Sequence, residues 1–191
     1  MITPTKLVGI SVASVGIAGG SAGAMYAFWP ETISIEKKLI EENKKILGEG
    51  NEALWGIKLA TYNRIKSKHE EIKLGGDKWS DLKKWCLQQT KSSFDEKKQK
   101  LYEGVKEVCI VPSHREKFKN ASKDLAGNDD WTSKAQEYTG TGDKVIVGIK
   151  KDSTTAKQLE TWCGKALEKE YEDDQKNDYP LVLKWCTKEG S

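Results

Sequence analysis

Residues 159–186 read LETWCGKALEKEYEDDQKNDYPLVLKWC, so that two cysteines stand 23 positions apart in a charged background. Apolar residues recur every three or four positions on both sides of residues 173–177, which is the spacing of one buried helix face. The run at 173–177, DDQKN, is rich in turn-forming residues and lies midway between Cys163 and Cys186. The stretch therefore predicts two antiparallel helices that bring these cysteines together.

Residues 82–109, LKKWCLQQTKSSFDEKKQKLYEGVKEVC, repeat this layout with Cys86 and Cys109, again 23 positions apart. A shift of 77 positions superimposes seven residues of the two stretches, and a shift of 76 superimposes two more upstream. The matching pairs are Trp55 and Trp131, Tyr62 and Tyr138, Leu82 and Leu159, Trp85 and Trp162, Cys86 and Cys163, Phe94 and Tyr171, Tyr102 and Tyr179, Val105 and Val182, and Cys109 and Cys186. Matches in one order with so little slippage indicate an internal duplication.

This pattern predicts a mainly α protein with two small helical repeats, at 51–112 and 129–191, joined by a linker at 113–128. Residues 31–50, rich in lysine and glutamate, are expected to form a charged juxtamembrane helix or linker after an anchor at 1–30. Ser80 is a candidate N-cap for the helix that carries the first Trp-Cys pair. The stretch KVIVGIK fits either a short strand or an apolar turn of helix.

Four cysteines allow three pairings, and the sequence leaves open a fourth state in which all are reduced and buried. The equal spacing favours the pairs Cys86–Cys109 and Cys163–Cys186, because a helical hairpin brings residues on either side of its turn together. Each bond would close a loop that stabilises the fold by about 3.5 kcal/mol in the chain-entropy model. In a repeat of this size, the disulfide would compensate for the small stabilisation that a small hydrophobic core provides.

The N-terminal segment has the composition of a membrane span. From Leu7 to Trp29 there are 23 residues without a charge, which as a helix would extend about 34 Å, enough for a hydrocarbon core of about 30 Å. Lys6 precedes the segment, so the positive-inside rule predicts a single pass with a cytoplasmic N-terminus and an extracellular body. The alternative is a signal peptide cleaved after Ala24, within an A-x-A-like site. Both alternatives export the body.

The charge pattern argues against a nucleic-acid partner. The chain has 32 basic and 29 acidic residues, a formal net charge of +3, and these alternate along the sequence. Nucleic-acid-binding proteins instead gather basic charge on one face or arm. Only Arg64 and Arg115 are arginines, which leaves few side chains for bidentate phosphate recognition.

Residues for catalysis, a cofactor or a metal are not recognisable in the sequence, so we expect no enzyme activity, no cofactor and no metal site. The two histidines, His69 and His114, stand apart in charged stretches and are expected to face solvent. TGTGDK at 139–144 lacks the G-K-[ST] ending of a phosphate loop. Among the seven tryptophans, Trp79 and Trp185 are the candidates for an exposed binding surface. Core positions are expected for Trp55, Trp85, Trp131 and Trp162, and Trp29 is expected at the membrane interface.

The layout of the chain resembles large paralogous families of membrane-anchored proteins in haemotropic mycoplasmas. The stretches that carry the resemblance are KLVGISVASVGIAGGSAGAMYAF, LKKWC, LETWC and LKWC. The resemblance implies a wall-less bacterium with a single membrane and a surface-displayed protein engaged in antigenic variation or contact with a host surface protein. It supplies no catalytic residues to carry over.

These observations favour a membrane-anchored surface protein that binds a host partner or varies antigenically. The alternative is an accessory subunit of a membrane transport or secretion complex, which would need an exposed apolar patch near Trp79 or Trp185. Neither the ligand nor the oligomeric state follows from the sequence.

Overall fold

The computed structural model describes residues 33–139, 145–150, 153–175 and 178–189. These described residues group as one compact unit. The expected membrane-spanning segment, Leu7–Trp29, lies outside the described residues. Among the helices that are described, none combines the length and the apolar composition that crossing a bilayer needs.

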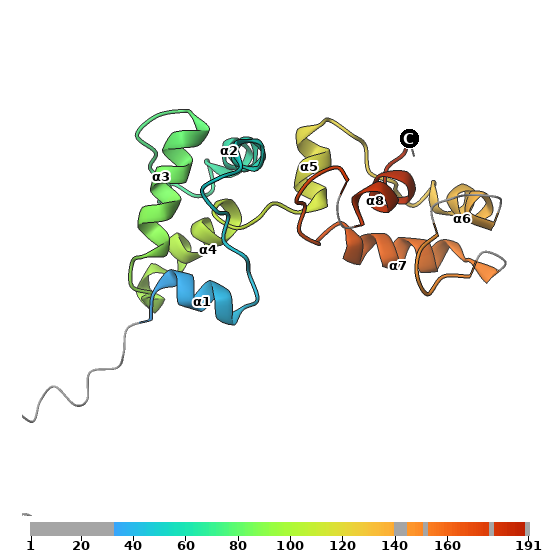
Figure 1. Ribbon diagram of the computed structural model, residues 1–191, viewed down its shortest axis with the longest axis horizontal. Helices are drawn as coiled ribbons and strands as arrows, with labels where there is room; N and C mark the ends of the chain where they lie inside the picture. The colour runs from blue at the N-terminus through green and yellow to red at the C-terminus, as the bar shows by residue number, and fades with distance from the viewer. Residues whose placement is uncertain (1–32, 140–144, 151–152, 176–177, 190–191) are drawn as a thin grey trace, which may run out of the picture. The chain divides into compact units, whose positions relative to one another are not determined.

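The described residues form helices and no β-strand, which confirms the expected mainly α class (Figure 1). In chain order the elements are α1 (Ile35–Glu41), α2 (Glu52–Ile65), α3 (Trp79–Thr90), the 3-10 helix η2 (Glu96–Lys98), α4 (Gln99–Val108), α5 (His114–Asn120), α6 (Trp131–Thr139), α7 (Ala156–Ala166) and α8 (Tyr179–Cys186). Part of KVIVGIK, residues 145–150, is neither strand nor helix: Ile149 N donates to Ile146 O at 3.1 Å and closes a turn.

Most helices begin at a side chain that satisfies a free backbone amide. Ser34, Asn51, Ser113 and Thr155 each accept a hydrogen bond from the amide three residues ahead, at the starts of α1, α2, α5 and α7. The expectation that Ser80 caps α3 is wrong. That helix begins at Trp79 with Lys78 at the N-cap position, two residues earlier than expected, and the Asp81 carboxylate accepts from Lys78 N at 3.1 Å.

Both disulfides expected from the spacing are present. Cys86 bonds Cys109 across α3 and the end of α4, with their Cα atoms 5.4 Å apart. Cys163 bonds Cys186 across α7 and α8, with a Cα separation of 5.5 Å. Each bond thus closes a helical hairpin, as the equal spacing predicts.

The first half (residues 33–112) and the second half (residues 113–189) share a set of backbone contacts. Leu47 N donates to Cys109 O at 2.9 Å, and Ala126 N donates to Cys186 O at 2.9 Å. Isolated bridges also recur: Ser34 with Ser93 and Ile46 with Ile110 in the first half, Ser113 with Glu170 and Leu125 with Thr187 in the second. Non-glycine residues with positive φ follow α1 and α5 at matching places, Asn43 at 55° and Ser122 at 53°.

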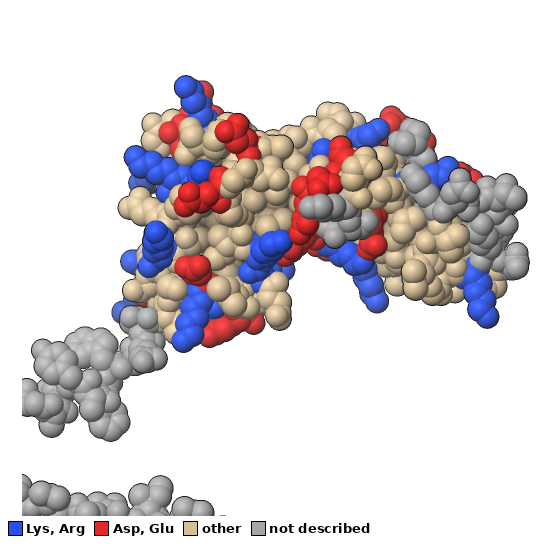
Figure 2. Space-filling model, in the orientation of Figure 1, with Lys and Arg blue, Asp and Glu red and all other residues tan. Residues whose placement is uncertain are grey.

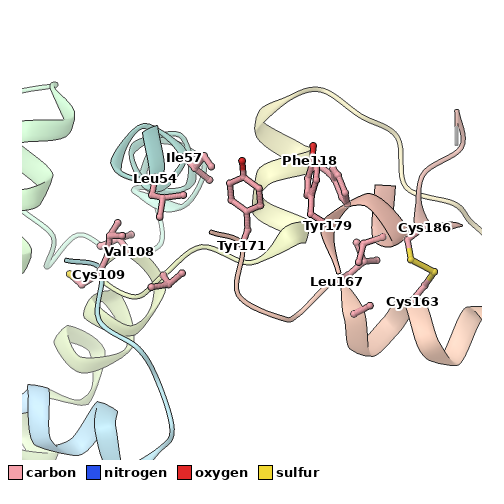
Figure 3. Packing of buried hydrophobic residues seen from close by; sticks show 14 of the residues in the cluster. Leu54, Ile57, Val108, Cys109, Phe118, Cys163, Leu167, Tyr171, Tyr179 and Cys186 are labelled. Atoms are coloured by element: carbon pink, nitrogen blue, oxygen red, sulfur yellow. A yellow bond between two sulfur atoms is a disulfide. The ribbon is translucent and has the colours of Figure 1, made fainter. Parts of the chain in front are cut away.

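The segment expected to be a linker, residues 113–128, contains α5, whose Phe118 is fully buried. Figure 3 shows Phe118 beside Tyr179 of α8, and the centroids of the two rings are 5.5 Å apart. Helix α5 also packs against α2 of the first half. It therefore connects the two halves through side-chain contacts as well as along the chain.

Candidate functional site

A cleft of about 1000 Å³ runs between the two halves and is lined by charged side chains from both. Helix α2 supplies Lys58 and Thr61, and α5 supplies Glu116 and Lys119. The segment after α7 adds carboxylates at Glu168, Glu170 and Glu172. On the face drawn in Figure 2, cationic and anionic side chains are interspersed.

A buried ion pair lies against the cleft. The Lys58 side chain is 1% exposed, and its Nζ donates to Glu116 Oε1 at 2.9 Å, Glu116 Oε2 at 3.0 Å and Glu107 O at 2.8 Å. Thr61 Oγ1 donates to the same carboxylate at 2.8 Å. Burial lowers the pKa of the Lys58 ammonium, against the attraction of Glu116. These bonds fix α5 against α2 and set one wall of the cleft.

Further ion pairs connect or line the cleft walls. Lys45 Nζ lies 3.0 Å from Glu172 Oε1 and joins the two halves, and this contact raises the pKa of Lys45. Arg115 Nε lies 2.5 Å from Glu168 Oε1. Lys169 pairs with Asp178. Because these groups are more exposed than Lys58, each pair contributes about 0–1 kcal/mol to stability.

Three cations at the cleft, Lys44, Arg64 and Lys119, form no ion pair with any other residue that the structure describes. Arg64 Nη2 instead donates to Thr61 Oγ1 at 3.0 Å. Among the described residues that line the cleft there is no histidine or cysteine. With these groups, the cleft can bind a polar or charged ligand through ionic contacts and hydrogen bonds.

The structure separates the two tryptophans proposed for binding. Trp79 is half-buried at the start of α3 and packs against the core. Trp185 is 2% exposed, with its ring 4.9 Å from that of Tyr138, so the expectation that it faces solvent is wrong. Because Tyr138 comes from α6, distant in sequence, this contact has no signal in the residues around Cys186. Neither tryptophan lines the cleft.

A turn at residues 145–149 exposes two apolar side chains at the surface. Val147 is 96% exposed and Val145 47% exposed, on either side of the buried Ile146. Tyr138 Oη accepts from Ile146 N at 2.8 Å and donates to Ile149 O at 3.1 Å. Gly148 has φ of +87°, a conformation that a side chain would strain. The turn therefore holds its valines outward on a fixed support.

The histidine expectations are corrected in part. His69 is half-buried, and its Nδ1 lies 2.7 Å from Glu71 Oε1. His114 is fully buried, so the expectation that it faces solvent is wrong. Sequence reasoning missed it because SHREKFKN is a charged stretch, whereas the rings that cover His114 come from 171 and 179. Within the described residues, no group of three histidine, cysteine or acidic side chains could hold a metal ion.

No family model, curated protein or solved structure matches this chain.

Proposed function

We propose that this protein is a membrane-anchored surface protein whose residues 32–191 form a binding module outside the cell. The observation that carries the proposal is that all four cysteines are paired in two disulfides. Disulfides persist in oxidising compartments and are rare in the reducing cytosol. A lysine- and glutamate-rich helical body with two disulfides is more typical of a small exported module than of a cytosolic protein.

The uncharged stretch Leu7–Trp29 supports the same proposal from the sequence. A single span with Lys6 inside would leave the disulfide-bonded body outside. The resemblance to surface proteins of haemotropic mycoplasmas agrees with this topology and supports a host surface protein as the partner. Under this proposal, Lys44, Arg64 and Lys119 at the cleft contact acidic groups of that partner.

Selective labelling of intact cells tests the proposal. An impermeant maleimide should leave the protein unlabelled before reduction and label all four cysteines after an impermeant reductant is added. A cytosolic thiol protein in the same cells serves as the control and should remain unlabelled until lysis. Free thiols that react only after lysis would place the body in the cytosol and overturn the proposal.

One observation favours the second candidate function, an accessory subunit of a membrane complex. Val147 is an almost fully exposed apolar side chain on the supported turn at 145–149. Isolated exposed side chains are common, but apolar groups held outward on a rigid support suit a fixed protein partner. If this function holds, Val147→Ser should reduce co-purification of a membrane partner, whereas Lys157→Ser, at an exposed polar site, should not.

We also infer that the two halves descend from one duplicated unit. The shared hydrogen bonds at Leu47 and Ala126, the recurring bridges and the two equally spaced disulfides support this origin. The bridges at Ser34 and Ser113 suggest that each unit begins before the limits expected from the tryptophans. The first unit then includes α1, and the second includes α5. On this view, α5 is the first helix of the second unit.

A further inference from the structure

His114 occupies a position where the first half has an apolar residue. It is the first residue of α5, directly after the N-cap Ser113, and its backbone N donates to Lys169 O at 3.1 Å. At the matching place, Ile35 follows Ser34 and its backbone N donates to Ser92 O at 2.9 Å. Both side chains are buried, 0% exposed for His114 and 2% for Ile35. A titratable ring thus fills a core position of the second half.

The hydrogen bond of His114 defines the tautomer of its neutral ring. Its Nδ1 lies 3.0 Å from Ala166 O, and a carbonyl oxygen can only accept, so Nδ1 carries the proton. Its Nε2 is buried and has no hydrogen-bond partner among the described residues. A second proton, on Nε2, would therefore place a charge and an N–H donor in a buried position without an acceptor among the described residues.

The surroundings of the imidazole are mostly aromatic. The Tyr179 ring of α8 lies 5.9 Å from it and the Tyr171 ring 6.1 Å, measured between centroids. Phe118, one turn along α5, packs on Tyr179 with centroids 5.5 Å apart (Figure 3). These groups offer apolar contact and ring edges, and none is a carboxylate that could stabilise an imidazolium.

The charged groups around this site are already paired. Asp178 and Lys169, whose charges act on His114 in opposite directions, form an ion pair with each other. Lys117 of α5 pairs with Asp174 at 3.2 Å and lies over the Tyr171 ring. On the side of α5 that faces α2, the Glu116 carboxylate forms an ion pair with Lys58. Burial lowers the pKa of His114, while the hydrogen bond to Ala166 and the charge of Asp178 oppose that shift.

We propose that His114 is a proton-sensitive latch that holds α5 against α7 and α8 when its ring is neutral and releases α5 when the ring is protonated. Helix α5 carries Arg115, Glu116 and Lys119 of the cleft wall. Release of its first turn changes the position of these side chains, and with them the charged surface of the cleft. The latch thereby couples acid pH to the shape of the binding cleft, whatever ligand the cleft takes.

The sign of the effect follows from the two protonation states. Opened or unfolded chain binds the proton with the ordinary pKa of about 6.5, whereas the closed form binds it less readily. The contribution of the neutral ring is therefore complete above about pH 6.5 and is lost as the pH falls. Because one proton is coupled, the opening equilibrium of α5 rises at most about tenfold per pH unit.

Hydrogen exchange on the full-length chain tests the latch, with protection factors corrected for intrinsic rates between pH 7.5 and 5.5. The reporters in α5 are the amides of Lys117 and Ala121, bonded to Ser113 O and Lys117 O. The matched reporters in α1 are the amides of Lys38 and Glu42, bonded to Ser34 O and Lys38 O. We expect protection in α5 to fall severalfold to tenfold over this range, with no such fall in α1.

The variant His114→Ile installs the residue that the first half uses at this position and should make protection in α5 independent of pH. His114→Gln, which keeps a donor for Ala166 O without a titratable ring, gives the same readout if the isoleucine variant does not fold. The proposal is overturned if α5 of the wild type shows no pH dependence. It is equally overturned if both reporters in a folded variant show the same dependence as in the wild type.

Discussion

The two halves of the molecule contain equivalent backbone hydrogen bonds and disulfides but differ in the first helix of each half. Hydrogen bonds such as Leu47 N to Cys109 O and Ala126 N to Cys186 O depend little on side-chain identity, and they recur. At the position after the first N-cap, Ile35 in the first half gives way to the buried His114 in the second. The backbone hydrogen bonds and disulfides are therefore shared. The titratable side chain that differs, His114, lies on α5, which also packs against α2 of the first half.

Two buried lysines extend the comparison. Lys58 of α2 donates to Glu107 O at 2.8 Å and also to the Glu116 carboxylate of the second half. Lys134 of α6, also buried, has Lys184 O at 3.5 Å. Burial lowers the pKa of both ammonium groups. Of these two buried lysines, only Lys58 bonds the two halves to each other, because α5 supplies the Glu116 carboxylate.

The largest expected effect concerns the disulfides. Replacing Cys86 and Cys109 together with alanine should lower the free energy of unfolding by about 3.5 kcal/mol, and replacing Cys163 and Cys186 should do the same, because the two loops are equally long. Chemical denaturation of both double variants measures this. A difference of more than about 2 kcal/mol between them would show that the halves are not energetically equivalent.

The next effect tests the bond between the halves. Glu116→Gln should lower the free energy of unfolding by roughly 3 kcal/mol, because it leaves the buried Lys58 ammonium without a carboxylate. Glu137→Gln is the matched control, because Glu137 of α6 is the exposed partner of Lys184 of α8. This variant should lower the free energy of unfolding by less than about 1 kcal/mol. Equal effects in urea titrations would contradict a special role for the Lys58–Glu116 pair.

A smaller effect is expected at the two serine caps. Ser34→Ala and Ser113→Ala should each lower the free energy of unfolding by about 1 kcal/mol, because each hydroxyl accepts from a first-turn amide, that of Lys37 or Glu116. Thermal denaturation of the two variants provides the measurement. If Ser113→Ala has no effect while Ser34→Ala does, the Glu116 carboxylate alone, which accepts from Ser113 N, is enough to start α5.

The smallest effect separates stability from binding at the turn at 145–149. Val147→Ser should change the free energy of unfolding by less than about 0.5 kcal/mol, because the side chain is already in solvent. Val182→Ser, at a fully buried position of α8, is the contrasting variant and should destabilise the protein clearly. A large loss of stability in Val147→Ser would mean that this valine packs against the protein itself.

The sequence predicted the paired helices of each disulfide-bonded hairpin and the disulfide pairing, because both depend on short-range patterns, but it placed α5 in a linker. The 23-residue spacing and the periodic apolar faces are visible within a single hairpin. Burial of His114 and Trp185 was not predictable in this way, since the rings that cover them come from other elements. Aligning Ser34 with Ser113, and Leu39 with Phe118, would have shown that His114 takes the place of Ile35.

The cleft could not be predicted either. One wall of the cleft depends on Lys58 and Glu116, 58 positions apart, which meet only because α5 packs on α2. Along the chain both residues look like members of an alternating, solvated charge pattern. Only the packing of the helices removes Lys58 from solvent and turns that pattern into a specific bond.

The measurement that tests this account most directly is mass spectrometry of peptides digested without reduction, from protein alkylated in intact cells. The account predicts two linked peptide pairs, Cys86 with Cys109 and Cys163 with Cys186, and no free thiol. A bond between a cysteine of the first half and one of the second, or four alkylated cysteines, would contradict two halves that are each closed by a disulfide of their own.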